Sequence, residues 1–308
     1  MQTASETEQP VQPAAPAPAQ EAAPAAAPAA PAGQHHQAPA VYEDSFDPAS
    51  EARYQEMLAK QHQPARALSE FKRTKLEADA ARNWDIFYKN NTTNFFKDRH
   101  WTHREFVELR ETGDALPRSR KLLEIGCGVG NFVFPLLQTN KELFIYACDF
   151  SPRAVEFVKA SPDYDEACCK AFVNDITADA LADHIPAESL DLVSAIYVLS
   201  ALPPHKMQRA VENIRSVLRP GGVVLFRDYG LYDAAQLRFK AENRIDDRFY
   251  ARHDGTFSYY FSTEFAKELF GNAGFEVLEC AYVKKEFVNR KEDLHMERVF
   301  LQARFQKK

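Results

Sequence analysis

The feature that most constrains the fold is a glycine-rich stretch at residues 121–131, KLLEIGCGVGN. A short apolar run ends in Glu124, glycines follow at every second position from Gly126, and an apolar pattern resumes at residues 132–137. This order predicts a strand, a tight loop and a helix. Glycine has no Cβ, so the backbone of such a loop can come close to a ligand.

The spacing of the glycines distinguishes between cofactors. A dinucleotide-binding loop has the pattern G-x-G-x-x-G, whereas here the third glycine, Gly130, comes one position early and Asn131 stands in its place. A pyrophosphate also has no use for an acidic residue just before the loop. Glu124 suits a cofactor that carries positive charge and an amino-acid moiety, and S-adenosylmethionine is such a cofactor.

Two further apolar runs also end in acidic residues. Residues 144–149 end in Asp149, about twenty residues after the glycines, where a doubly wound sheet places the group that holds ribose hydroxyls. Residues 171–173 are followed by Asp175 and Ile176, which suit an adenine amino group and ring face. Each acidic strand end alone often just caps the next helix. Three of them behind a glycine loop favour a cofactor site.

Composition divides the chain. Residues 1–40 hold 8 of the 18 prolines, three glutamates and no Lys or Arg, so they cannot bury enough apolar side chain to fold. We predict a disordered tail over 1–45, a helical arm over 46–115 and a cofactor-binding α/β domain over 116–308. Membrane-spanning runs, a mitochondrial presequence and a secretory signal are not found. We therefore expect a soluble, cytosolic protein with access to the nucleus.

The cysteines and the net charge exclude other classes. No cysteine pairs with another as C-x-x-C or with a histidine at ligand spacing, so we expect reduced buried thiols and no metal. The net charge is −6, and −3 without the three tail glutamates, so nucleic acid would have to bind local basic patches. These patches are Arg66 with Lys72, Arg73 and Lys75; Lys97, Arg99, His100, His103 and Arg104; Lys284, Lys285, Arg290 and Lys291; and Lys307 with Lys308.

The arm interleaves aromatic and basic residues. Residues 46–82 predict one or two helices, broken at Pro64. Both tryptophans of the chain follow, among phenylalanines, a tyrosine and basic side chains, at residues 84–104. Basic groups bind phosphates and aromatic rings stack on unpaired bases, so this composition is typical of an RNA surface. It also fits a hydrophobic arm that folds over the cofactor, and both interpretations can hold together.

The end of the fourth predicted strand, residues 189–196, is where chemistry occurs in such sheets. It continues as YVLSALPP at residues 197–204, without the Asn/Asp-Pro-Pro-aromatic tetrad used on exocyclic amines and without a cysteine that could attack a pyrimidine ring. Two nucleic-acid methylation chemistries are thereby excluded. A helix over 205–218 and a strand over 223–226 follow.

Motifs in the second half resemble one family. They are RDYGLYD at 227–233, QLRF at 236–239, FYARHDGT at 249–256, YYF at 259–261 and RVFLQ at 298–302, with FFKDRHW at 95–101 and LSA at 199–201. From about residue 70 onward the chain resembles the methyltransferase-like family that makes 3-methylcytidine in the anticodon loop of tRNA. The first motif and DFSPRA at 149–154 are more similar to the serine-tRNA branch than to the threonine-tRNA branch.

The resemblance implies a class I, Rossmann-like S-adenosylmethionine-dependent methyltransferase, with a seven-stranded, mostly parallel sheet and a reversed last strand. It implies methyl transfer to N3 of cytosine 32 in tRNA, of serine tRNAs in particular, with seryl-tRNA synthetase as a partner. Threonine or other tRNAs stay an alternative. So do two other classes: an N-methyltransferase for small molecules or proteins, and an RNA-binding subunit without activity.

The resemblance also implies site residues. Asp228 would face the flipped cytosine, and Tyr229 and Phe96 would sandwich it. The cofactor would be held by Trp84 and Tyr88 as a lid, Glu124, Gly126 and Gly128 at its amino-acid end, Asp149 at the ribose, Asp175 and Ile176 at the adenine, and Ile196 at the end of the fourth strand. RNA phosphates or the flipped nucleotide would be held by Lys97, Arg99, His100 and Arg298. Arg298 also lies in a segment that alternates like a final strand.

Overall fold

The computed structural model describes residues 41–61, 68–289 and 294–308. Most of the predicted tail, the predicted break at Pro64 and the basic residues Arg66, Arg290 and Lys291 lie outside these ranges. Within them, the predicted order of strands and helices from the glycine loop onward is confirmed.

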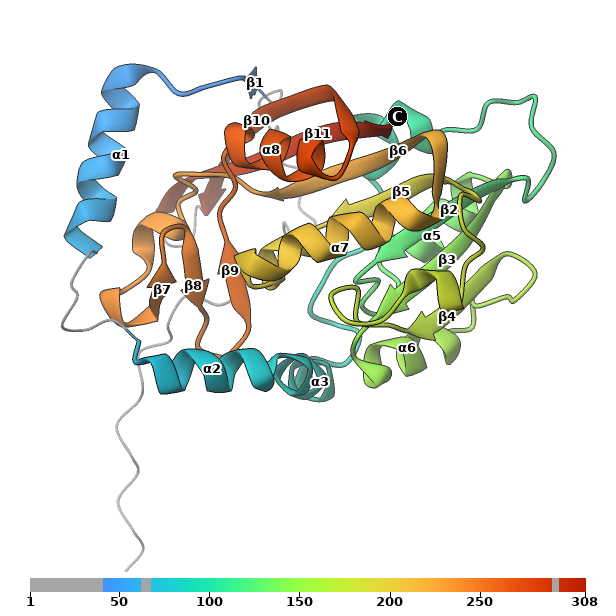
Figure 1. The fold of residues 1–308 in the computed structure, drawn as a ribbon, viewed down its shortest axis with the longest axis horizontal. Helices are drawn as coiled ribbons and strands as arrows, with labels where there is room; N and C mark the ends of the chain where they lie inside the picture. The colour runs from blue at the N-terminus through green and yellow to red at the C-terminus, as the bar shows by residue number, and fades with distance from the viewer. Residues whose placement is uncertain (1–40, 62–67, 290–293) are drawn as a thin grey trace, which may run out of the picture.

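An eight-stranded mixed sheet forms the centre of the molecule (Figure 1). Its strand order is β1-β10-β11-β6-β5-β2-β3-β4. The five strands from β4 to β6 are parallel, and β11 is antiparallel to both of its neighbours, β6 and β10. The strands are β1 (Val41–Glu43), β2 (Arg120–Ile125), β3 (Leu143–Asp149), β4 (Cys169–Val173), β5 (Leu190–Ile196), β6 (Leu218–Tyr229), β10 (Phe275–Asn289) and β11 (Leu294–Lys307).

The eighth strand is a difference from the sequence prediction. Seven strands correspond to the predicted sheet with its reversed last strand, and β1 adds an edge strand antiparallel to β10. Because β1 lies at Val41–Glu43, the predicted tail boundary at residue 45 is wrong for these residues. Side chains reinforce the pairing: Tyr42 donates a short hydrogen bond to Glu105, and Lys284 pairs with Glu43.

Helices cover both faces of the sheet (Figure 1). Apolar residues alternate along each strand, so Leu123 and Val193 pack with α7 and α8, whereas Leu122 and Leu192 pack with α5 and α6. Side-chain hydroxyls cap α6 at Ser151 and α8. The helices of the domain are α5 (Val133–Thr139), α6 (Pro152–Lys159), α7 (Pro204–Val217) and α8 (Thr263–Asn272).

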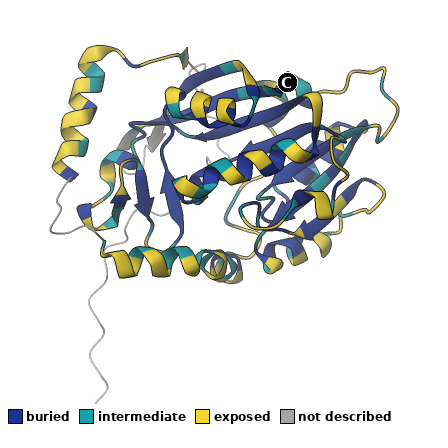
Figure 2. Ribbon diagram, in the orientation of Figure 1, coloured by how far each residue is buried: buried dark blue, intermediate teal, exposed yellow. Residues whose placement is uncertain are grey.

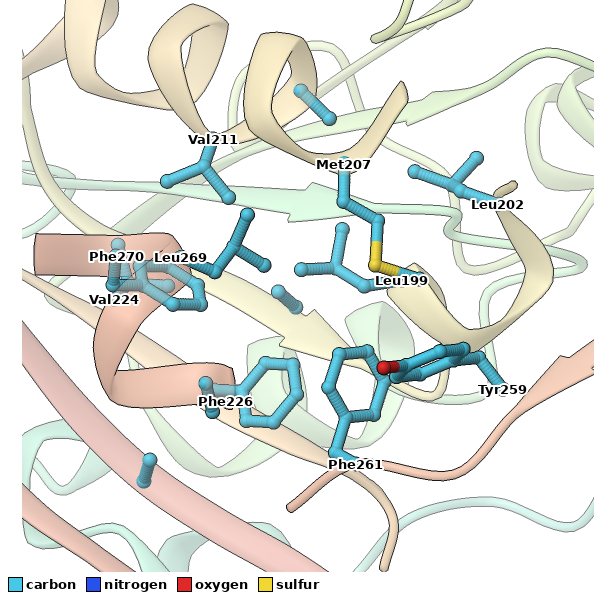
Figure 3. Close-up of a cluster of buried hydrophobic side chains, with 14 of the residues drawn as sticks. Leu199, Leu202, Met207, Val211, Val224, Phe226, Tyr259, Phe261, Leu269 and Phe270 are labelled. Atoms are coloured by element: carbon cyan, nitrogen blue, oxygen red, sulfur yellow. The ribbon is translucent and has the colours of Figure 1, made fainter. Parts of the chain in front are cut away.

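The main core lies between the sheet and α7 and α8. Figure 3 shows Met207 and Val211 of α7 above Phe226 of β6, with Leu199 and Phe261 beside them. Figure 2 shows the same region in dark blue, while α1 and α2 are mostly exposed. The five cysteines are free and buried, as predicted. Lys307 is buried as well, and its ammonium contacts Glu188, so it is not part of a basic surface patch.

The arm contains α1 (Pro48–Gln61), α2 (Glu70–Ala78), α3 (Ala80–Asn91) and α4 (Thr102–Glu105). Helix α3 is tied to α6 through Asp85 and Arg153, and the N–H of Arg99 donates to the carbonyl of Asn131 in the glycine loop. A three-stranded antiparallel sheet, β7 (Arg244–Asp246), β8 (Phe249–Ala251) and β9 (Phe257–Tyr259), adds to the domain. Among the described residues, no helix is both long and apolar enough to cross a bilayer.

Candidate functional site

A cavity of about 760 Å³ opens at the carboxyl ends of β2, β3, β4 and β5. Strand β2 lies between β3 and β5, so the cavity sits where the strand order reverses, the position at which open α/β sheets bind ligands. Arm residues 96–99, Trp101 and α3 form its opposite wall. Among the described residues, no cluster of side chains suits a metal ion.

The glycine loop forms one wall, as the sequence predicts. Gly126 has a φ of +60°, and a Cβ there would come within 2.6 Å of the Val198 side chain. At Gly128 a Cβ would come within 3.1 Å of the Tyr88 hydroxyl. Both glycines are therefore required by backbone conformation or close packing, and the loop lies directly against the lid helix α3.

Asp149 lies at the end of β3 and lines the cavity, as predicted for a ribose ligand. Its carboxylate accepts hydrogen bonds from the N–H groups of Gly128 (3.0 Å) and Ser151 (2.9 Å), which fix its orientation. Burial raises the pKa of the Asp149 carboxyl to about 6, and these N–H groups oppose that rise.

Glu124 and Ile196 lie beneath the cavity rather than on its surface. Glu124 is 1% exposed, and its carboxylate lies 3.4 Å from the Arg99 guanidinium, which also donates to the carbonyl of Ile196 at 3.2 Å. Burial raises the pKa of Glu124 to about 8, and Arg99 opposes that rise. Both residues therefore position Arg99, which does line the cavity.

The predicted adenine end is brought together. Asp175 and Ile176 line the cavity, and Asp175 is oriented by the N–H and hydroxyl of Thr177 at 2.9 and 2.7 Å. The sequence analysis missed Asn174 as a binding residue. Its buried side-chain amide lines the same wall and has no protein partner for either its oxygen or its nitrogen.

The predicted lid is also in place. Trp84, Tyr88 and Phe96 line the cavity, and they belong to one cluster with Phe87 and Phe95. Lys97 lies on the same rim, whereas His100 is exposed and is not part of the lining.

At the other end, β6 presents alternate residues to the cavity. Arg227 and Tyr229 line it, but Asp228 points to the opposite face and is fully buried. The structure therefore does not bring Asp228 to a position from which it can touch a base. The Tyr229 ring lies 5.6 Å from the Arg252 guanidinium and 6.0 Å from that of Arg298.

Arg298 both lines the cavity and holds the fold. Its Nε donates to the buried Asp233 carboxylate at 2.7 Å, while its Nη2 is buried without a protein partner. The Asp233 charge raises the pKa of Arg298, against the effect of burial. The structural and ligand-binding interpretations from the sequence are thus compatible.

Comparisons with known proteins agree with this geometry. Residues 123–224 match the family described as "Methyltransferase domain". The tRNA N(3)-cytidine methyltransferase METTL6 of Homo sapiens is 55% identical over 240 residues, covering 78% of this chain and 84% of the human protein. The tRNA N(3)-methylcytidine methyltransferase trm141 of Schizosaccharomyces pombe is 44% identical over 243 residues, covering 78% of this chain and 97% of that one. The chain belongs to the tRNA N(3)-cytidine methyltransferase family.

The fold of this tRNA N(3)-cytidine methyltransferase family member is the class I methyltransferase fold. A solved SAM-dependent methyltransferase from Anabaena variabilis matches it with a TM-score of 0.51 at 13% identity, over 74% of this chain and 95% of that one. Likeness at this identity concerns the fold alone.

The sequence analysis of this family member missed several lining residues. Tyr197 follows β5 with a φ of +59°, and its ring lies 5.5 Å from Tyr229 and 5.6 Å from the Arg99 guanidinium. Such a conformation is rare for a bulky residue and concentrates at functional sites. Arg252 lies within a motif already noted, and Arg227 alternates with Tyr229, so strand alternation was the available signal for Arg227.

Proposed function

We propose that this protein transfers a methyl group from S-adenosylmethionine to N3 of a cytosine in the anticodon loop of tRNA, at position 32. One observation carries the proposal: a single cavity joins the glycine loop and Asp149 to an aromatic and cationic end around Tyr229. In a small-molecule N-methyltransferase, the cationic residues at that end of the cavity would have no role. A binding subunit without activity gives no account of the intact loop, Asp149 and Asp175.

The residues present fit the cofactor. Gly126 and Gly128 line the cavity where an amino-acid moiety would lie, and the Asn174 amide has free donors and acceptors for the nucleoside. Asp149 would accept from the ribose hydroxyls, and Asp175 with Ile176 would hold the adenine, under the lid of Trp84 and Tyr88. When bound, S-adenosylmethionine supplies a methyl group on a positively charged sulfur.

The protein's own task is to position the base and exclude water. N3 of neutral cytosine carries an in-plane lone pair, so no general base is needed. The base has to leave its stack, and the rings of Tyr229 and Phe96 lie on the cavity surface where it would stack.

Cations along one sheet face would bind the nucleotide's phosphates. Arg227, Arg298 and Lys285 line the cavity from three neighbouring strands. Arg227 Nε and Arg298 Nη2 are buried without a protein partner, and buried donors of this kind are costly unless a ligand satisfies them. Arg227 is 4.7 Å from the Trp101 ring centroid, which fixes its plane.

The function is tested with purified protein, S-adenosylmethionine and anticodon stem-loop RNAs that carry cytidine or uridine at position 32. Mass spectrometry of digested RNA is expected to find 3-methylcytidine only in the first RNA. Bound cofactor without methylated RNA, in the presence of total tRNA and seryl-tRNA synthetase, would rule the proposal out in favour of a binding subunit.

Cofactor affinity is expected to depend on pH. The pKa of Asp149 is raised to about 6, so its carboxylate is ionised at pH 8 and becomes protonated as the pH falls through 6. Ribose hydroxyls donate to the ionised form, so affinity is expected to fall about tenfold per unit below pH 6. Calorimetric titration from pH 8 to pH 5, with circular dichroism as the folding control, checks this, and a flat profile contradicts it.

The serine-tRNA preference and a seryl-tRNA synthetase partner are part of the proposal. The motif RDYGLYD and the small net charge support them, since a body of this charge binds tRNA weakly alone. Gel-shift titration of serine and threonine tRNAs, with and without the synthetase, tests both points. The cytosolic location stays a prediction.

A further inference from the structure

One turn joins the cavity to the core. This 3-10 turn, η4 (Leu199–Ala201), comes after β5, from which it is separated by Tyr197 and Val198. Leu199 is fully buried and packs in the core beside Met207, Phe226 and Phe261 (Figure 3). Ser200, the next residue, lines the cavity and is 2% exposed. The packing of Leu199 therefore fixes where the Ser200 hydroxyl lies.

Asp228 holds this turn from behind. Its carboxylate accepts from the N–H of Ser200 at 2.9 Å and from the N–H of Tyr229 at 2.9 Å, and the Ser200 side chain also lowers the pKa of this carboxyl. Burial raises the pKa of Asp228 to about 6, and the Ser200 contacts oppose that rise, so the group is ionised at pH 7. An ionised carboxylate only accepts hydrogen bonds, so a Ser200 hydroxyl turned toward it donates the hydrogen bond and keeps its own proton. The lone pairs of Ser200 Oγ are then left for a ligand.

A donor lies near this acceptor. Arg252 lines the cavity, its guanidinium lowers the pKa of Asp228, and it lies 5.6 Å from the Tyr229 ring centroid. Its guanidinium donates a long hydrogen bond to Ser258 Oγ, at 3.4 Å, and it also interacts with the Tyr229 side chain. Phe257 completes this end of the lining.

The pair offers the acceptor and the donor that one pyrimidine edge needs. Cytosine presents an amino group, the N3 lone pair and the C2 carbonyl in a row, so it needs an acceptor on one side of N3 and a donor on the other. Uracil presents a carbonyl where cytosine has the amino group. In uracil, the lone pairs of Ser200 Oγ would face the lone pairs of that carbonyl oxygen, and the two acceptors would repel each other.

We propose that Ser200 Oγ accepts a hydrogen bond from the exocyclic amino group of the target cytosine, with Asp228 as the positioning residue that keeps the hydroxyl in the accepting orientation. This inference rests on the proposed function and adds the group that distinguishes cytosine. It gives Asp228 a role through Ser200, in place of the direct contact expected from the sequence.

A substrate without the amino group provides the test. Stem-loop RNAs carry either cytidine or the 2-pyrimidinone ribonucleoside at the target position, and the second keeps N3 and the C2 carbonyl. Methylation is measured for the wild-type protein, Ser200→Ala, Asp228→Asn and the control Ser216→Ala, whose hydroxyl bonds a helix carbonyl outside the cavity. The lower intrinsic reactivity of the pyrimidinone is common to all four proteins and cancels between them.

The wild-type protein and Ser216→Ala are expected to prefer cytidine. Ser200→Ala is expected to lose about tenfold or more in kcat/KM for cytidine and little for pyrimidinone, so the preference shrinks by that factor. Asp228→Asn is expected to shrink it too, whereas a purely structural role would lower both rates equally. An unchanged preference in Ser200→Ala, with cofactor affinity intact by calorimetry, overturns the inference. Failure of the wild-type protein to methylate cytidine instead overturns the proposed function.

Discussion

Asp149→Ala is expected to lower the affinity for S-adenosylmethionine by about 30-fold or more. The substitution removes the acceptor for the ribose hydroxyls, and it leaves the N–H groups of Gly128 and Ser151 without their partner. A lost buried hydrogen bond costs about 1–3 kcal/mol, and the loss of two bonds to the ribose hydroxyls corresponds to about 30-fold or more in affinity.

Isothermal titration calorimetry measures this loss, and thermal unfolding verifies that the variant is folded. Asp163→Ala is the matched control, because Asp163 is exposed and is not part of the cavity lining. Unchanged affinity in the folded Asp149→Ala protein would mean that the cofactor does not lie against β3.

Arg298→Met is expected to lower the free energy of unfolding by about 3–5 kcal/mol, because it keeps an apolar stem but leaves a buried charge unpaired. Asp233 is fully buried, and Arg298 supplies its only charged partner among the described residues, at 2.7 Å. Two N–H groups, of Val299 and Ala235, would remain on the carboxylate, which places the loss toward the lower end of this range.

Urea unfolding followed by tryptophan fluorescence measures the free energy. Asp233→Asn combined with Arg298→Met is the informative comparison, since the double variant carries no unpaired charge and is expected to recover part of the loss. A single variant as stable as the wild type would show that Arg298 serves only the ligand. The same substitution would then be expected to affect RNA methylation alone.

The parallel part of the fold was predictable because its signals are local. Each strand that ends in Glu124, Asp149 or Asp175 is a continuous apolar run next to a turn, and the glycine spacing separates the cofactor classes. The sequence therefore correctly predicted that the residues at the ends of these strands lie at the carboxyl edge of the sheet.

The side of the strand on which a residue points was less predictable. Asp228 was expected to face the base, but strand alternation places Arg227 and Tyr229 in the cavity and Asp228 behind it. Resemblance identifies a motif, not the direction of each side chain within it. Asn174 was missed because its side-chain amide is uncharged and stands beside an acidic residue in the sequence. Its importance lies in the absence of a protein hydrogen-bond partner for its buried amide, which only the structure shows.

The short strand β1 could not be predicted, since three residues next to a proline- and alanine-rich segment have no periodicity to detect. Its place in the sheet nevertheless has a practical consequence. A chain shortened to begin at residue 46 would uncover the part of β10 at Tyr282, Val283 and Lys284 that β1 pairs with, and an open strand edge is a template for intermolecular pairing and aggregation. Shortened forms that begin before Val41 are therefore expected to aggregate less than forms that begin at residue 46.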